Sequence, residues 1–246
     1  MIKRLKSPLL ARTLSPLFKI AIFAALFWWL AQSRSLVAFI AYAAWGGVLH
    51  GTLFHYKSHS PFFLSFLSLY VFGCVAALTL PANVPAAVAG FVLAALLFVL
   101  WGVYVPVFSR YRFYASLVYY SFFFLVVAWA SAQIFTGGWW LIPFVWIELY
   151  VITKEYVSLF LEGWNRRAAA FVLVASLLVL EEMFVASLLS FGSLAVASLA
   201  IISILTALDG YAHAVRGVLT RDLLYKDAII FIGLSAAVLA AQMALG

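Results

Sequence analysis

The sequence predicts an all-α fold, a polytopic membrane bundle of about nine transmembrane helices with the N-terminus inside the cell and the C-terminus outside. Hydrophobic residues make up 67% of the 246-residue chain and charged residues only 9%, whereas about a quarter of a soluble domain is charged. Apolar runs recur along the chain, most of them near the roughly 20 residues that a spanning helix needs. Basic residues gather in alternate connections between these runs, as they do in membrane proteins.

The first element is a basic segment, residues 1–16, followed by an apolar run. This order is also that of a secretory signal peptide. However, Ala31 and Ser33 match a small-residue cleavage site poorly, and another apolar run follows at once. We therefore expect residues 1–16 to stay on the cytoplasmic side, and residues 17–246 to form a single transmembrane domain of a multi-pass cell-membrane protein.

Nine apolar runs follow the basic segment, and each predicts one spanning helix. The first and the eighth are shorter than the others. The runs lie at about 17–32, 36–54, 61–80, 86–107, 113–134, 139–161, 168–190, 193–208 and 228–245.

The basic residues predict the orientation of these helices. With the N-terminus inside, the cytoplasmic segments hold 13 of the 15 lysines and arginines, and the outer connections hold only Arg34. Because Lys and Arg are retained on the cytoplasmic side of membranes, this asymmetry indicates an odd number of spans. It also accounts for the formal charge of +7, so we expect a lipid bilayer and no nucleic acid as the partner of these charges.

The sixth and seventh runs form a predicted hairpin that carries four glutamates in apolar surroundings. Glu148 and Glu181 are equally far along the chain from the turn, so antiparallel helices would place both roughly 25 Å from it. Since ionised groups in hydrocarbon are costly and usually face a bundle interior or a wet cavity, we expect Glu148 to contact Glu181 or Glu182. With Glu155, these residues are candidates for handling a proton or a cation. The alternative is a protonated glutamate that hydrogen-bonds across helices, typically worth under about 2 kcal/mol.

A second group of polar residues is predicted near the cytoplasmic side. Lys154 and Asp209 fall at similar depths when counted from the outer ends of their runs, so we expect Asp209 to neutralise Lys154. The alternative for Lys154 is a side chain that extends along the helix to the inner headgroups.

A metal site is also a hypothesis, with His50, His55, Asp209 and His213 as the ligands of zinc or iron. Asp209 and His213 are four residues apart, so on a continuous helix they share a face. Two observations oppose this site: the ligand spacings match no closed zinc pattern, and Gly210 is a possible end of the eighth helix. The alternative is that these histidines are interfacial residues without a metal.

Segment 210–227 lies between the eighth and ninth runs and has apolar residues at helical spacing. This pattern favours an amphipathic helix along the inner interface, in contact with anionic lipid or a membrane-protein partner. A solvated linker is the alternative.

Three functions agree with these patterns. The first is a small transporter or permease in which the buried glutamates handle a proton or a cation. The second is a non-catalytic scaffold subunit that contacts partners through exposed helix faces. The third is a membrane enzyme that acts on a lipid-like substrate, with the cytoplasmic histidines and Asp209 as its site. The sequence identifies neither a substrate nor a cofactor.

Overall fold

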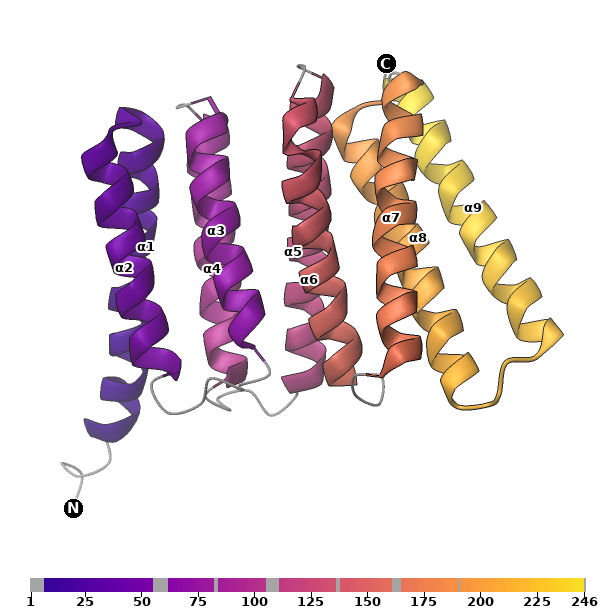
Figure 1. Cartoon of the computed structure of the whole chain (residues 1–246), viewed down its shortest axis with the longest axis horizontal. Coiled ribbons are helices and arrows are strands. Elements are labelled where there is room, and N and C mark those ends of the chain that lie inside the picture. Colours follow the sequence, from indigo (N-terminus) through magenta and orange to yellow (C-terminus); the bar gives the residue numbers. More distant parts are fainter. Residues whose placement is uncertain are drawn as a thin grey trace. The chain divides into compact units, whose positions relative to one another are not determined.

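Nine α-helices account for most of the chain in the computed structural model, which describes residues 7–54, 62–81, 84–104, 111–135, 138–160, 165–189 and 191–245. Each predicted apolar run corresponds to one of these helices, so the all-α prediction is confirmed (Figure 1). A 3-10 turn, Trp139–Leu141, leads into the sixth helix. The helices are α1 Ser7–Ser33, α2 Leu36–Phe54, α3 Phe63–Thr79, α4 Val84–Tyr104, α5 Tyr111–Phe135, α6 Ile142–Phe160, α7 Arg166–Leu188, α8 Ser193–Val215 and α9 Arg221–Leu245.

Four of the described helices are long and apolar enough to cross a membrane, namely those at Phe113–Ile134, Arg166–Leu188, Ser193–Val215 and Arg221–Ala244. Shorter apolar stretches lie in α1 to α4. Helix α6 falls in neither group, and it carries three charged residues, Glu148, Lys154 and Glu155. These helices indicate a membrane protein, whereas the number of nine spans and the orientation stay predictions.

The contacts of the chain divide it into two compact units, Met1–Val118 (the N-terminal unit) and Tyr119–Gly246 (the C-terminal unit). In the N-terminal unit, α1 contacts α2, α3 and α4, and α3 also contacts α2 and α4. In the C-terminal unit, α6, α7, α8 and α9 pack in chain order.

The N-terminal unit is held together by aromatic side chains that lie against glycines of the next helix. The Tyr42 hydroxyl of α2 donates to the carbonyl oxygen of Tyr70 on α3 at 3.0 Å, and the Tyr70 hydroxyl donates in return to the carbonyl oxygen of Tyr42. The Tyr70 ring lies where a Cβ on Gly46 would be, and a Cβ on Gly73 would come within 2.6 Å of the Tyr42 hydroxyl. Close approach of the two backbones therefore depends on both glycines.

Bulky side chains join α5 to α6 in the C-terminal unit. Trp129 of α5 packs edge-on against Phe144 of α6, with ring centroids 6.1 Å apart. The next helix, α7, begins at a conventional cap, since the side-chain oxygen of Asn165 accepts a hydrogen bond from the backbone N–H of Ala168 at 2.8 Å.

The boundary between α8 and α9 differs from the sequence interpretation. Helix α8 continues through Gly210 and ends five residues after it. Gly217 then has φ of 68°, its N–H donates to Ala214, and the N–H of Val218 donates to His213. This is a Schellman ending, which glycine favours because it has no Cβ. Segment 210–227 is therefore not one interfacial helix. It comprises the end of α8, a short turn and the first part of α9.

Candidate functional site

The two units differ in charge. All eight acidic residues of the sequence lie in the C-terminal unit, and nine of the 15 lysines and arginines lie in the N-terminal unit. Chemistry that needs a carboxyl group is therefore confined to the C-terminal unit.

Two of these carboxyl groups are buried on α6. Glu148 is 3% exposed and Glu155 is 6% exposed. They are seven residues apart, so they lie on the same face of the helix. The hydroxyl of Tyr119, a buried residue of α5, donates to Oε2 of Glu155 at 3.2 Å. Helix α5 therefore supplies a hydrogen-bond donor to a buried carboxyl group of α6.

The two glutamates of α7 have different surroundings. Glu181 is exposed and Glu182 is half-buried, and both line a groove of about 440 Å³ that α7 forms with the start of α8. The Ser203 hydroxyl of α8 interacts with the carboxyl group of Glu182. Glu182 thus contacts Ser203 of α8. The contact between Glu148 and Glu181 or Glu182 stays a prediction.

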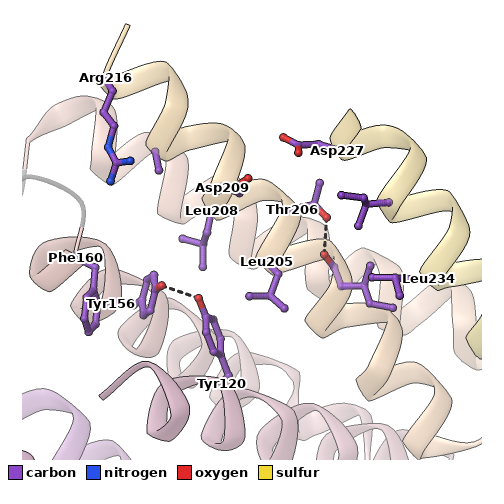
Figure 2. Close-up of a pocket in the computed structure, with 13 residues that line it drawn as sticks. Tyr120, Tyr156, Phe160, Leu205, Thr206, Leu208, Asp209, Arg216, Asp227 and Leu234 are labelled. Carbon is purple, nitrogen blue, oxygen red and sulfur yellow. Dashed lines mark hydrogen bonds between the residues drawn. The ribbon is translucent and has the colours of Figure 1, made fainter. Parts of the chain in front are cut away.

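A larger cavity, of about 520 Å³, lies among α5, α6, α8 and α9 (Figure 2). Much of its wall is hydrocarbon, from leucine and isoleucine side chains of α8 and α9. Its polar lining comes from all four helices and consists of Tyr120, Tyr156, Thr206, Asp209, Arg216 and Asp227.

The polar groups of the cavity lie on two sides. On one side, the hydroxyls of Tyr120 and Tyr156 are 2.6 Å apart and hydrogen-bonded to each other. On the other side are Asp209 of α8 and Asp227 of α9, and Figure 2 shows Asp227 pointing from α9 toward α8. The Oδ2 atom of Asp227 is buried and has no hydrogen-bond partner among the described residues. The cavity therefore combines apolar walls with an unsatisfied acidic group.

Asp209 contacts a histidine of its own helix. Its Oδ2 is 3.5 Å from Nε2 of His213, one turn later on α8. This contact is possible because α8 continues through Gly210. Lys154 lies half-buried on α6. The neutralisation of Lys154 by Asp209 is not among the ion pairs of the described side chains, and it stays a prediction.

Hydroxyl groups continue from the cavity toward Glu155. Tyr119, Tyr120, Thr153 and Tyr156 line a small void of about 10 Å³ together with four apolar residues, and the surface of this void is apolar. The Thr153 hydroxyl is buried in this part of the unit and has no hydrogen-bond partner among the described residues. The rings of Tyr119 and Tyr156 are in edge contact, with centroids 5.8 Å apart. Two tyrosines of the cavity lining, Tyr120 and Tyr156, thus lie next to Tyr119, which donates to Glu155.

The described residues give the predicted metal site no support. His50 belongs to α2 of the N-terminal unit, where its ring packs edge-on against Phe63 at 4.9 Å. Asp209 and His213 belong to the C-terminal unit, and His55 lies outside the described residues. Where side chains are described, no three His, Cys, Asp or Glu residues lie close enough together to hold a metal ion.

Sequence reasoning missed the tyrosines and Asp227. A signal for the tyrosines was present, because a tyrosine in an apolar run needs a hydrogen-bond partner for its hydroxyl. Tyr119 and Tyr120 lie within the fifth run, and Tyr156 directly follows Glu155 in the sixth. Asp227 was assigned to the interfacial segment, although it lies inside α9.

Comparisons of the chain with protein-family models, with curated proteins and with solved structures find no match.

Proposed function

We propose that this chain is a small transport protein of the cell membrane, in which the C-terminal unit couples a substrate in the cavity to a proton on Glu155. One observation carries the proposal. A carboxyl group that is 6% exposed accepts a hydrogen bond from Tyr119, and the ring of Tyr119 contacts Tyr156, which lines a cavity with two acidic residues.

A buried carboxyl group suits this role for a physical reason. Its charge changes from −1 to 0 when it binds a proton, and electrostatic interactions are stronger in a protein interior than in water. Ionisable residues within membrane proteins commonly mark proton relays and ion pathways for this reason. Protonation of Glu155 would therefore change the potential felt by a charged substrate in the neighbouring cavity.

The hydroxyl groups supply a route for the proton. A tyrosine or threonine hydroxyl both donates and accepts a hydrogen bond, so a proton can pass along such groups as each bond reverses. Tyr120 and Tyr156 already share one hydrogen bond, at 2.6 Å. The ring of Tyr156 is in contact with that of Tyr119, and movement of these side chains would complete the route from the pair to Tyr119 and Glu155.

The test uses purified protein in liposomes that contain a pH-sensitive dye. Gradients of Na⁺, K⁺ or tetraethylammonium are imposed in turn, and the lumenal pH is followed. We expect protein-dependent proton movement with at least one of these cations, and we expect Glu155→Gln to reduce it to the level of protein-free liposomes. Glutamine keeps the size and hydrogen-bonding capacity of the side chain but removes the titration.

The control is Asp222→Asn, which removes an exposed carboxyl group in the first turn of α9. This variant should move protons as the wild type does. Proton movement that is absent with all three cations, or that survives in Glu155→Gln, would contradict the proposal.

A scaffold subunit is the second candidate, and α9 is the observation that favours it. No residue of the described stretch Arg221–Ala244 is buried, and Ile229 is 71% exposed. Purification from native membranes in mild detergent, followed by native mass spectrometry, should then show a stoichiometric partner that is lost from Ile229→Arg. A partner-free chain would leave transport as the remaining candidate. No observation on the described residues favours the membrane enzyme, since no three His, Cys, Asp or Glu side chains among them lie close enough together to hold a metal ion.

A further inference from the structure

We propose that the ligand of the 520 Å³ cavity is an organic monocation with an apolar body. This inference rests on the proposed function and names the substrate class of the same site. It is carried by the charge of the cavity lining, by the unsatisfied oxygen of Asp227, and by the size and apolar character of the walls.

The sign of the ligand follows from the charged side chains. Asp209 and Asp227 come from neighbouring helices, α8 and α9, whereas Arg216 is the basic residue in the lining. Arg216 and Asp209 are both exposed, and Asp209 also contacts His213, so the charges of these two residues are screened, whereas Asp227 is half-buried. The lining therefore carries an excess of one negative charge, and a monocation would balance it.

Asp227 is the lining residue that a bound cation would stabilise most. A buried carboxylate oxygen without a hydrogen-bond partner is costly, because it has lost its contacts with water and gained none in return. Oδ2 of Asp227 is in this position, and it lies in the cavity wall. An ammonium or phosphonium group near this oxygen would offset that cost, in part through its charge alone.

Size and chemistry favour an organic cation over a metal ion. A cavity of about 520 Å³ is within the range of about 300–1,000 Å³ typical of small-molecule sites and far larger than an inorganic ion. Ca²⁺ needs about six to eight oxygen ligands, and the described residues hold no group of three metal-binding side chains.

The walls suit a ligand with hydrocarbon around its charge. Leucine and isoleucine side chains of α8 and α9 form much of the surface, and Tyr156 and Phe160 of α6 add aromatic rings. Aromatic faces attract organic cations by about 0.5–2 kcal/mol. The carboxyl groups would therefore select the charge, while the rings and aliphatic groups would hold the body of the ligand.

The experiment is equilibrium dialysis of tetraphenylphosphonium against the full-length protein in detergent, with protein-free micelles as background. We expect saturable binding that Asp227→Asn weakens by about 10- to 100-fold, as loss of a charged contact does. Asp222→Asn, which changes an exposed carboxyl group on the same helix, should bind as the wild type does. Tetraphenylborate, which has nearly the same shape and the opposite charge, should show no saturable binding when it is dialysed on its own.

Folding of each variant is checked by gel filtration and thermal unfolding, and Asp227→Glu serves as a second variant that keeps the charge. Binding by Asp227→Glu and not by Asp227→Asn supports the proposal. Equal binding by Asp227→Asn and the wild type, or saturable binding of tetraphenylborate dialysed on its own, would overturn it.

Glu155→Gln separates this inference from the proposed function. It leaves the cavity carboxyls intact, so binding of tetraphenylphosphonium should stay saturable and should still depend on Asp227, while proton movement is lost. The affinity should fall below that of the wild type, because glutamine resembles the protonated, neutral Glu155. Proton movement without tetraphenylphosphonium binding would overturn the substrate class and leave proton-coupled transport standing. Binding that depends on Asp227, in a protein that moves no protons with any cation, would support the substrate class and contradict the coupling.

Discussion

Both units of this chain use tyrosine hydroxyls to connect helices, but the hydroxyls bind different partners. In the N-terminal unit, Tyr42 and Tyr70 donate to each other's backbone carbonyl. In the C-terminal unit, Tyr119 donates to the carboxyl group of Glu155, and Tyr120 bonds to the hydroxyl of Tyr156. A backbone carbonyl only accepts hydrogen bonds, whereas carboxyl and hydroxyl groups can also give up a proton. The same residue type therefore bonds to the backbone in one unit and to ionisable or hydroxyl side chains in the other, and proton transfer by the second set is part of the proposed function.

Charge sharpens the contrast. The N-terminal unit has no acidic residue in its sequence, so its buried tyrosines have no carboxyl group of their own unit to bind. Gly46 and Gly73 instead bring the backbone of the facing helix within reach. The close helix contacts at Gly46 and Gly73 thus lie in the N-terminal unit, and the acidic side chains lie in the C-terminal unit.

The largest expected effect on stability is that of Gly46→Ala in the N-terminal unit. The new methyl group would collide with the Tyr70 ring, and overpacking of this kind costs about 1–3 kcal/mol. The midpoint of thermal unfolding in detergent should fall. Gly47→Ala is the matched control, because no atom lies within 4 Å of the added Cβ and alanine favours a helix by about 0.5–1 kcal/mol. Equal behaviour of the two variants would mean that the Tyr70 ring does not depend on Gly46.

A smaller effect on stability, but a larger one on activity, is expected for Tyr119→Phe. This change removes the donor to Glu155 at a cost of about 0.5–1.5 kcal/mol, typical of one intramolecular hydrogen bond. Proton movement in liposomes should also slow, because the route loses a hydroxyl.

The counterpart is Tyr42→Phe, which removes a bond to a backbone carbonyl at a cost of about 0.5–1.5 kcal/mol. It should lower the unfolding midpoint slightly and leave proton movement unchanged. If Tyr42→Phe slowed proton movement as much as Tyr119→Phe does, the division of roles between the units would be wrong.

The helices were predictable from the sequence because their signal is local. A run of about 20 apolar residues predicts a helix whatever it packs against, and each predicted run overlaps one helix of the structure. The hydropathy signal failed at the start of α9, where Asp222, Lys226 and Asp227 interrupt the apolar pattern. Gly217, and not Gly210, ends α8, and only the backbone conformation distinguishes the two glycines.

The cavity was not predictable in the same way, because it depends on how helices rotate and how their side chains meet. Seven-residue spacing correctly placed Glu148 and Glu155 on one face of α6. It gave no information about the residue on α5 that faces them. The contact between Tyr119 and Glu155 joins residues 36 positions apart, and no single-helix pattern encodes such a pair.

The sparse packing of α9 has a consequence for motion. Regions with few buried contacts open at a low free energy, without unfolding of the rest of the protein. Helix α9 has no buried residue in its described stretch, yet it supplies Asp227, Ile230 and Leu234 to the cavity. Its backbone amides should therefore exchange with deuterium sooner than those of α8. Helix α9, which carries the unsatisfied carboxylate oxygen of Asp227, is thus the wall of the cavity that can move away with the smallest loss of packing contacts.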